Sequence, residues 1–367
     1  MYKLSFLLTG LSLLLIACSP KEPVRIGYIG SITGKNSDLG VAARDAAILA
    51  VESVNTSGGI NGRKIELIDK DDAQNPDTAA RVAQELIGSK VVAIVGPLAS
   101  SMTKASLPVI NNAKVVMISP TASSNELSGR DDFFFRVMEP NTLFAKHQAE
   151  TCRKLKIKRV AAIYDIQNKT YTVEMFNTFK DEFVRQGGIV ASEIRFDSQS
   201  SPSFSRLVAQ LDLKSAGAVM VLANTIDSLN IAQQIRKVNP EITILSGACG
   251  IAQRDLLEQA GKSIDNIIFT LPVNSRSETA AYRQFSADFK NRFHYEPTFA
   301  ATLAYDAMQL IFTALRKNPD SARLRDTIKG IESFTGLQGE VKLDRYGDPS
   351  RNLFVTRYLK GHEEVIK

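Results

Sequence analysis

The chain has 367 residues, which is too long for one ordinary domain and fits two. Hydrophobic residues make up 44% of it and charged residues 23%, a composition typical of a folded globular protein. Its 45 Lys and Arg against 39 Asp and Glu give a net charge of +6, and these basic residues are spread along the chain, which excludes a dedicated nucleic-acid tract. Three cysteines and three scattered histidines exclude a disulfide framework and a helical zinc site.

The first residues have the features of a secretory leader. One positive charge, Lys3, precedes a mostly apolar run from Leu4 to Ala17, which is too short to cross a bilayer. The ending Leu15-Ile16-Ala17-Cys18 resembles the bacterial lipobox, so we expect residues 1–17 to be removed and Cys18 to carry a lipid. Residues 18–23 would then be a tether that anchors the protein to a membrane without spanning it. The alternatives are an ordinary signal peptide with a chance cysteine, or a core helix.

From Val24 onward, strand-like and helix-like segments alternate, which predicts an α/β fold with parallel sheets between layers of helices. Apolar residues at helical spacing, such as Phe176, Phe179 and Phe183, predict the helices that cover the sheets. Asp77, after Pro76, is a candidate N-cap. Short runs rich in Val and Ile predict buried strands at Val24–Ile29, Lys64–Ile68, Val91–Val95, Val115–Ile118, Val160–Tyr164, Ala218–Leu222, Ile242–Leu245 and Ile267–Leu271.

The alternation occurs twice, first over residues 24–140 and again over 141–270. Helical patterns at 279–293 and 299–315 follow, and then two late strands near Glu340–Leu343 and Leu353–Leu359. No long Gly/Ser-rich or Pro-rich linker separates the two sets, so we expect two lobes between which the chain crosses more than once.

No complete catalytic or metal motif is present in the sequence. Gly30–Lys35 lacks the spacing of a phosphate-binding loop, and a turn into a helix explains it. Asp71 and Asp72 follow a strand, where a turn with helix capping explains them better than a metal site. His147 and Cys152 lie five residues apart and face different sides of a helix. We therefore predict no catalytic residue, no metal and no cofactor.

Two neighbouring strand ends carry small hydroxyl residues. Val95–Ser101 and Ile118–Ser124 place hydroxyl groups and backbone N–H groups at the carboxyl edge of a parallel sheet, where open α/β sheets bind ligands. A helix N-terminus at this edge suits an anionic group such as a carboxylate. The serines could instead be plain N-caps, and the presence of two such loops favours a ligand site. These serines are Ser100, Ser101, Ser123 and Ser124.

An ordered series of short motifs resembles a known family. The motifs are Ile26–Gly34, Asn55–Gly62, Asp71–Pro76, Val95–Ser101 and Met117–Leu127. In order and spacing they resemble the type I periplasmic solute-binding proteins of ABC importers, in the group of the leucine/isoleucine/valine-binding protein. The resemblance covers essentially all of the mature chain. It implies two Rossmann-like lobes joined by three crossover segments, with a ligand cleft between lobes that close on the solute.

The resemblance also implies how the chain is divided. The N-terminal lobe would comprise residues 24–140 and 273–347, and the C-terminal lobe residues 141–272 and 348–367. The crossovers are expected near residues 138–142, 271–275 and 344–352.

The family's ligand contacts can be carried over position by position. Its two binding loops, which hold the carboxylate and amino ends of the ligand, correspond to positions 98–100 and 121–123. Tyr171 matches an aromatic residue that closes from the second lobe, and Phe299 would supply an apolar wall. The predicted ligand-binding residues are Leu98, Ala99, Ser100, Thr121, Ala122, Ser123, Tyr171, Thr225, Cys249 and Phe299.

One predicted position departs from the family pattern. Cys249 falls where the amino-acid binders have the acidic residue that takes the amino group. A buried thiol resists ionisation and cannot replace that anion. Compared with the family's amino-acid binders, we therefore expect the part of the site that binds the carboxylate to be kept and the part that binds the ammonium group to be altered.

The resemblance implies a non-enzymatic lipoprotein of the bacterial cell envelope, facing the periplasm or cell exterior. It would capture a branched-chain amino acid or a related small carboxylate or amide and deliver it to an ABC permease in the inner membrane. We expect a monomer held to the membrane by the lipid on Cys18, with no nucleic-acid partner. The alternative is an envelope regulator or sensor that uses the same fold without transport.

Overall fold

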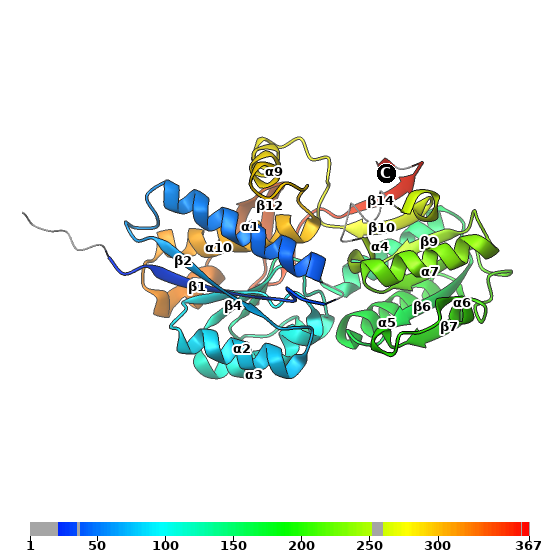
Figure 1. Cartoon of the computed structure of the whole chain (residues 1–367), viewed down its shortest axis with the longest axis horizontal. Coiled ribbons are helices and arrows are strands. Elements are labelled where there is room, and N and C mark those ends of the chain that lie inside the picture. The colour runs from blue at the N-terminus through cyan, green and yellow to red at the C-terminus, as the bar shows by residue number, and fades with distance from the viewer. Residues whose placement is uncertain (1–20, 35–36, 252–259, 361, 367) are drawn as a thin grey trace, which may run out of the picture.

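The computed structural model describes residues 21–34, 37–251, 260–360 and 362–366, and it forms two α/β lobes that lie side by side (Figure 1). Each lobe has one main sheet, five-stranded in the first lobe and seven-stranded in the second. The proposed signal peptide and Cys18 lie outside the described residues. No helix in the described part of the chain is long and apolar enough to cross a membrane.

The first lobe is built on a fully parallel sheet with the strand order β2-β1-β3-β4-β5. Helices α2 and α3 contact each other below this sheet, and α1 and α10 contact each other above it (Figure 1). The strands are β1 Val24–Gly30, β2 Ile65–Asp71, β3 Ala93–Val95, β4 Val116–Ser119 and β5 Phe134–Arg136. The helices are α1 Ser37–Thr56, α2 Pro76–Gly88, α3 Ser100–Ala113, η1 Asn125–Leu127, α9 Ala280–Phe293, α10 Phe299–Lys317, η5 Ser321–Arg323 and α11 Leu324–Lys329.

The second lobe has the strand order β15-β14-β10-β9-β8-β6-β7. Its strands β6 to β10 pair in parallel, whereas β14 is antiparallel to both β10 and β15. The strands are β6 Arg159–Asp165, β7 Ile189–Phe196, β8 Ala218–Leu222, β9 Thr243–Ser246, β10 Ile267–Leu271, β14 Phe354–Leu359 and β15 His362–Val365. The helices are α4 Asn141–Lys154, α5 Lys169–Arg185, η2 Ser198–Ser200, α6 Phe204–Val208, α7 Thr225–Val238, η3 Ala248–Ile251 and η4 Gly261–Ile264.

The chain passes between the two lobes more than once. It enters the second lobe after β5, returns to the first after β10, and joins the second sheet again at β14. Before that last passage, β11 Ser333–Gly336, β12 Gly339–Leu343 and β13 Pro349–Ser350 form a small antiparallel sheet, and β11 contacts α10.

The predicted strands and late helices are present, with ends that shift by a few residues. Among the described strands, the sequence did not predict β5, β7, β11, β13 or β15. Strand β5 has three residues, one of them the fully buried Arg136, so its apolar run is short and interrupted. Strand β7 lies at the edge of its sheet and carries Ser192, Glu193 and Arg195, so it lacks the double-sided apolar pattern of the central strands.

The helix start at α2 differs from the prediction. The N-cap is Asn75, whose side chain accepts a hydrogen bond from the Thr78 N–H, and Pro76 takes the first helical position. The prediction of Asp77 as the cap was therefore wrong, because Asp77 lies one residue inside the first turn. Asp71 ends β2 and Asp72 follows it, and their carboxylates accept hydrogen bonds from the backbone N–H groups of Ile32, Ala73 and Gln74 around the turn that leads to α2. No acidic, His or Cys cluster suited to a metal occurs among the described residues.

Candidate functional site

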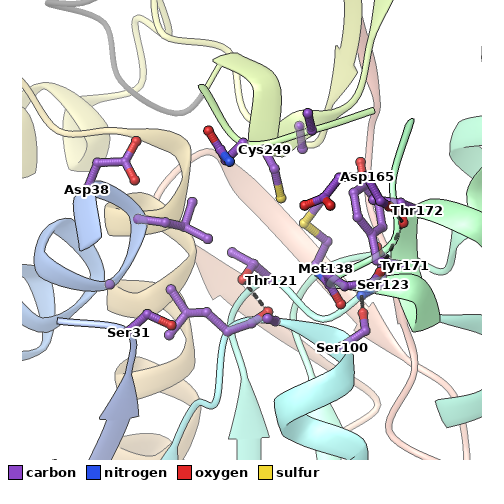
Figure 2. A pocket seen from close by; sticks show the side chains of 18 of the residues that line it. Ser31, Asp38, Ser100, Thr121, Ser123, Met138, Asp165, Tyr171, Thr172 and Cys249 are labelled. Carbon is purple, nitrogen blue, oxygen red and sulfur yellow. Dashed lines mark hydrogen bonds between the residues drawn. The ribbon is translucent and has the colours of Figure 1, made fainter. Parts of the chain in front are cut away.

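A cavity of about 60 Å³ lies between the two lobes, at the carboxyl ends of their parallel strands (Figure 2). A single water needs roughly 10–15 Å³ by this measure, so the cavity has room for a small solute. Both lobes contribute to its wall. The residues that line it are Ser31, Asp38, Leu39, Gly40, Leu98, Ala99, Ser100, Thr121, Ser123, Met138, Asp165, Asn168, Tyr171, Thr172, Ala223, Asn224, Ala248, Cys249 and Phe299.

The first wall of the cavity begins at the turn between β3 and α3. Gly96 opens this turn with a φ of 98°, and a Cβ atom there would lie 1.9 Å from the Ile29 carbonyl oxygen, so only glycine fits. The turn brings Leu98, Ala99 and Ser100 into the cavity. Ala99 is the N-cap of α3 and its side chain makes no capping bond, so neither Ser100 nor Ser101 caps this helix.

Ser100 joins the two binding loops. Its Oγ accepts hydrogen bonds from the backbone N–H groups of Ser123 at 3.2 Å and Ser124 at 3.3 Å. A hydroxyl has two lone pairs and one proton, so both acceptor positions are used and the proton remains for donation. Ser100 also stands in the first turn of α3, where backbone N–H groups lack helical partners. This corner of the cavity therefore suits an acceptor, such as a carboxylate oxygen.

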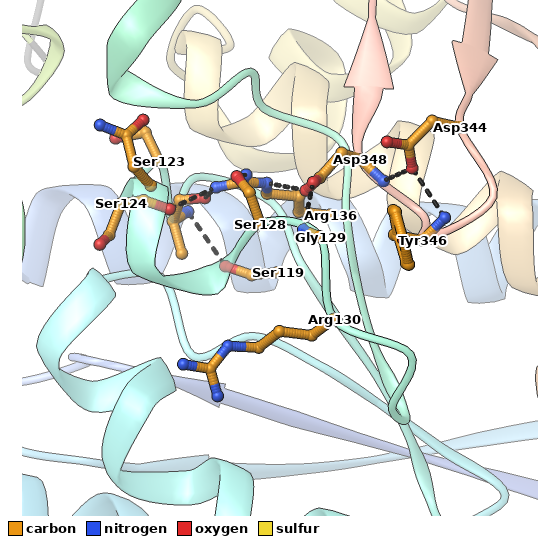
Figure 3. A network of polar contacts seen from close by, with 12 residues as sticks. Ser119, Ser123, Ser124, Ser128, Gly129, Arg130, Arg136, Asp344, Tyr346 and Asp348 are labelled. Carbon is orange, nitrogen blue, oxygen red and sulfur yellow. Dashed lines mark hydrogen bonds and ion pairs between the residues drawn. The ribbon is translucent and has the colours of Figure 1, made fainter.

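Internal hydrogen bonds fix the second loop. The Thr121 hydroxyl donates to the Leu98 carbonyl at 2.8 Å, and the Ser123 hydroxyl donates to the Asn141 side chain at 2.8 Å. From the other side, the buried Arg136 guanidinium donates to the carbonyls of Ala122 and Ser124 and pairs with Asp348 at 2.8 Å (Figure 3). Contacts within the protein thus hold the loop from both sides.

Two predicted site residues do not line the cavity. The Ala122 carbonyl faces Arg136, and its side chain lies in the apolar cluster of the first lobe. Thr225 lies behind Cys249, and its hydroxyl donates to the Cys249 carbonyl at 3.0 Å. The neighbouring Asn224, the N-cap of α7, lines the cavity in its place. The other predicted residues, Leu98, Ala99, Ser100, Thr121, Ser123, Tyr171, Cys249 and Phe299, all line the cavity.

Tyr171 and Cys249 belong to the wall that the second lobe contributes. Burial raises the pKa of the Tyr171 phenol well above its ordinary value, with Cys249 as a smaller cause. Burial also raises the pKa of the Cys249 thiol to about 12, and the nearby Asp38 carboxylate adds to this shift. Cys249 is therefore a neutral thiol near pH 7, and this position carries no anion.

Two carboxylates that the sequence did not predict line the cavity. Asp165, at the end of β6, accepts hydrogen bonds from the Ser198 N–H at 3.0 Å and hydroxyl at 2.8 Å. Asp38, in the first turn of α1, has a pKa raised by burial, which hydrogen bonds from the Leu39 N–H and the Thr225 hydroxyl partly oppose. No Lys, Arg or His of the described chain lines the cavity with them.

The strand-end rule that located the serines could also have found Asp165 and Asn224. Asp165 ends the apolar strand β6, and Asn224 follows β8 directly before α7. Asp38 and Met138 carry no such signal, because one begins a helix and the other lies in the segment between the lobes.

Hydrogen bonds across the cleft hold the lobes together around the cavity. Asn168 accepts from the N–H and hydroxyl of Ser101, and Glu174 accepts from the hydroxyl of Ser124 and the N–H of Asn125. On the opposite side, Thr225 of the second lobe lies 3.3 Å from the Asp38 carboxylate of the first. The structure is thus in a closed form.

Known proteins are similar to this chain along nearly its whole length. Residues 23–363 match the family described as periplasmic binding protein. The Leu/Ile/Val-binding protein of Escherichia coli K12 is 25% identical over 334 residues, which are 89% of this chain and 88% of that protein. The Leu/Ile/Val-binding protein homolog 3 of Brucella melitensis is 26% identical over 344 residues, covering 90% of each.

Solved structures have the same fold. The branched-chain amino acid transporter substrate binding protein LivJ from Streptococcus pneumoniae, in complex with isoleucine, matches with a TM-score of 0.86 at 25% identity, over 94% of this chain and 99% of that one. A solute binding protein from R. palustris in complex with benzoate matches with a TM-score of 0.81 at 19% identity, over 94% of this chain and 95% of that one. The chain therefore belongs to the periplasmic binding protein family. Within that family it is a type I member of the branched-chain amino acid group.

Proposed function

We propose that this protein is the substrate-binding component of an ABC importer, and that it captures a branched-chain amino acid or a related small carboxylate or amide. The observation that carries the proposal is the cavity between the lobes, in which the Ser100 hydroxyl retains its proton for an acceptor. The relatives named for binding Leu, Ile and Val, and the structure with bound isoleucine, support the class of solute.

Capture would proceed by closure of two lobes. We assign residues 24–140 and 273–347 to one lobe and 141–272 and 348–367 to the other; the division of strands between the two main sheets supports this. The solute would bind to the open first lobe, and contacts from the second lobe would then stabilise the closed form. A solute can shift this equilibrium only by its greater affinity for the closed form.

The solute carboxylate would bind at Ser100 and at the loop of Thr121 to Ser123. Tyr171 and Phe299 would enclose the apolar part of the solute, because both are buried and line the cavity. We propose binding without catalysis, which the relatives named as binding proteins support.

The protein would act in the bacterial cell envelope as a monomer, anchored by a lipid on Cys18, and would deliver its solute to a permease in the inner membrane. The sequence Leu15-Ile16-Ala17-Cys18 supports the anchor. Relatives described as transporter substrate-binding proteins support the permease partner.

A binding screen of the purified protein tests this function. The standard L-amino acids, the desamino analogues of leucine, isoleucine and valine, and benzoate would each be added in a thermal-shift assay and then measured by calorimetry. We expect saturable binding of a small solute with a dissociation constant on the order of micromolar. The absence of binding by every solute, together with stable capture of an envelope protein, would instead indicate a regulator or sensor.

A further inference from the structure

Asp38 presents a carboxylate to the cavity from the first lobe (Figure 2). The contact that it receives across the cleft is weak. The Thr225 hydroxyl lies 3.3 Å from Asp38 Oδ2 and 3.0 Å from the Cys249 carbonyl oxygen. A hydroxyl has one proton, so these two acceptors share it, and the shorter contact goes to the carbonyl.

The partners of Asp38 in the described chain are all neutral. They are the Thr225 hydroxyl and backbone N–H groups at the start of α1. The other cavity carboxylate, Asp165, receives two hydrogen bonds from Ser198 and a third from the Gln167 N–H at 3.2 Å. Of the two, Asp38 has the weaker hydrogen-bond partners among the described residues. A partly buried carboxylate with no cation beside it is costly, and a cationic group of a solute would offset that cost.

At the position of Cys249 the second lobe supplies no anion, and the carboxylate that it brings to the cavity, Asp165, already accepts three hydrogen bonds. Cys249 stands across the cavity from it and is a neutral thiol, because burial raises its pKa to about 12. Its carbonyl is already the acceptor of the Thr225 hydroxyl. Among the described residues, Asp38 of the first lobe is therefore the cavity carboxylate with the weaker hydrogen-bond partners.

We propose that Asp38 binds the cationic group of the solute, while the Ser100 corner binds its carboxylate; this inference rests on the proposed function. The cavity would then select zwitterionic amino compounds over acids that lack an amino group. Because Asp38 also contacts Thr225, a cation held there would lie against both lobes and stabilise the closed form.

Calorimetry with paired probes tests this assignment. The probes are L-leucine, L-isoleucine and L-valine, each beside its desamino analogue, and the other standard amino acids. We expect the wild-type protein to bind the best amino acid at least about tenfold more tightly than a matched desamino acid, since hydrogen bonds to charged groups have this strength. D38N should lose this preference by weakening the binding of the amino acid and not that of the desamino acid.

D77N is the matched control, because Asp77 also lies in the first turn of a helix but is exposed and outside the cavity. It should bind all probes as the wild type does. The double variant D38N/C249E returns a carboxylate to the cavity from the second lobe and should regain preference for the amino acid, which also shows that the variants fold.

The outcomes separate this inference from the proposed function. Equal binding of amino acids and desamino acids by the wild type, or unchanged binding by D38N, would overturn the role of Asp38 and leave the proposed function standing. Failure of the wild type to bind any probe of the screen would overturn both.

Discussion

Ser100 is the residue on which the geometry of the first-lobe site depends. It is buried, and its Oγ is the acceptor for two backbone N–H groups of the neighbouring loop. Removing the oxygen leaves both N–H groups without that acceptor, and a buried donor without a partner costs about 1–3 kcal/mol.

We predict that S100A loses solute binding and also some stability, by about 1–3 kcal/mol in the free energy of unfolding. Urea denaturation and calorimetry would measure the two effects. S106A is the matched control, because Ser106 lies on the same helix, is also buried, and donates only to the Met102 carbonyl of its own helix. If S100A binds its solute as S106A does, the solute does not use the Ser100 corner.

Individual site residues were predictable from sequence to different degrees. Ser100 and Ser123 follow apolar strands, and the rule for parallel sheets places such residues at a ligand-binding edge. Asp38 could not be found in this way, because an Asp in the first turn of a helix is explained by the helix alone. Only the approach of the second lobe, with Thr225 and Cys249, makes it part of a cavity.

At the scale of elements, the segment between β5 and α4 carries a buried carboxylate. Glu139 is fully buried, and its Oε1 accepts a hydrogen bond at 2.9 Å from the N–H of Arg351, which follows β13. No described residue is a hydrogen-bond partner of its Oε2. The nearby guanidinium groups already pair elsewhere, Arg351 with Asp306 at 2.6 Å and Arg136 with Asp348 at 2.8 Å.

This environment makes the stability of the protein depend on pH. Burial raises the pKa of Glu139 from 4.5 to about 7, although Arg351 and Arg136 oppose the shift. A carboxyl group whose pKa is raised by folding stabilises the fold at low pH, and this contribution is lost as pH rises through the folded pKa. The loss reaches about 3 kcal/mol between pH 4.5 and above 7.

E139Q should remove this dependence, because an amide does not ionise. Between pH 5 and pH 8 the wild type should lose stability and E139Q should not. We therefore predict that the unfolding free energy of E139Q minus that of the wild type increases by up to about 3 kcal/mol over this range. Urea denaturation at several pH values would measure it. A constant difference between the two proteins across this range would show that Glu139 keeps its charge state, and the explanation would be wrong.

The central strands that the sequence predicted share one property, which is an apolar run that packing alone explains. Strands β1, β8 and β10 are of this kind, and their residues are almost all buried. Strand β5 was missed because Arg136 interrupts its apolar run, and this arginine is buried only because distant groups, Asp348 and the carbonyls of the second loop, accept its hydrogen bonds. A long-range partner of this kind leaves no local periodicity.

At the scale of the whole molecule, side chains of the second lobe accept hydrogen bonds from the first lobe at the starts of two helices. Asn168 accepts hydrogen bonds from Ser101 in the first turn of α3. The Glu174 carboxylate accepts bonds from Ser124 at 2.6 Å and from the Asn125 N–H at 2.7 Å, at the start of η1. Acceptors placed at helix N-termini satisfy N–H groups that lack helical partners, and negative charge there is favoured by the helix dipole.

Because these bonds exist only while the lobes are together, Glu174 should stabilise the closed form without touching the solute. A solute whose binding needs the closed form binds more weakly when that form is less populated. We predict that E174A lowers the affinity of the best solute about tenfold or more, since the lost bonds involve a charged group.

Two measurements together identify this role. Calorimetry would give the affinity, and small-angle X-ray scattering would show a larger radius of gyration for E174A than for the wild type at a solute concentration that saturates only the wild type. E182A is the matched control, because Glu182 lies on the same helix and bonds to Arg185 and Gln186 of its own lobe. If E174A matches E182A in both measurements, the Glu174 contacts do not stabilise the closed form. The free energy of closure would then come from the contacts of the solute with the residues that line the cavity.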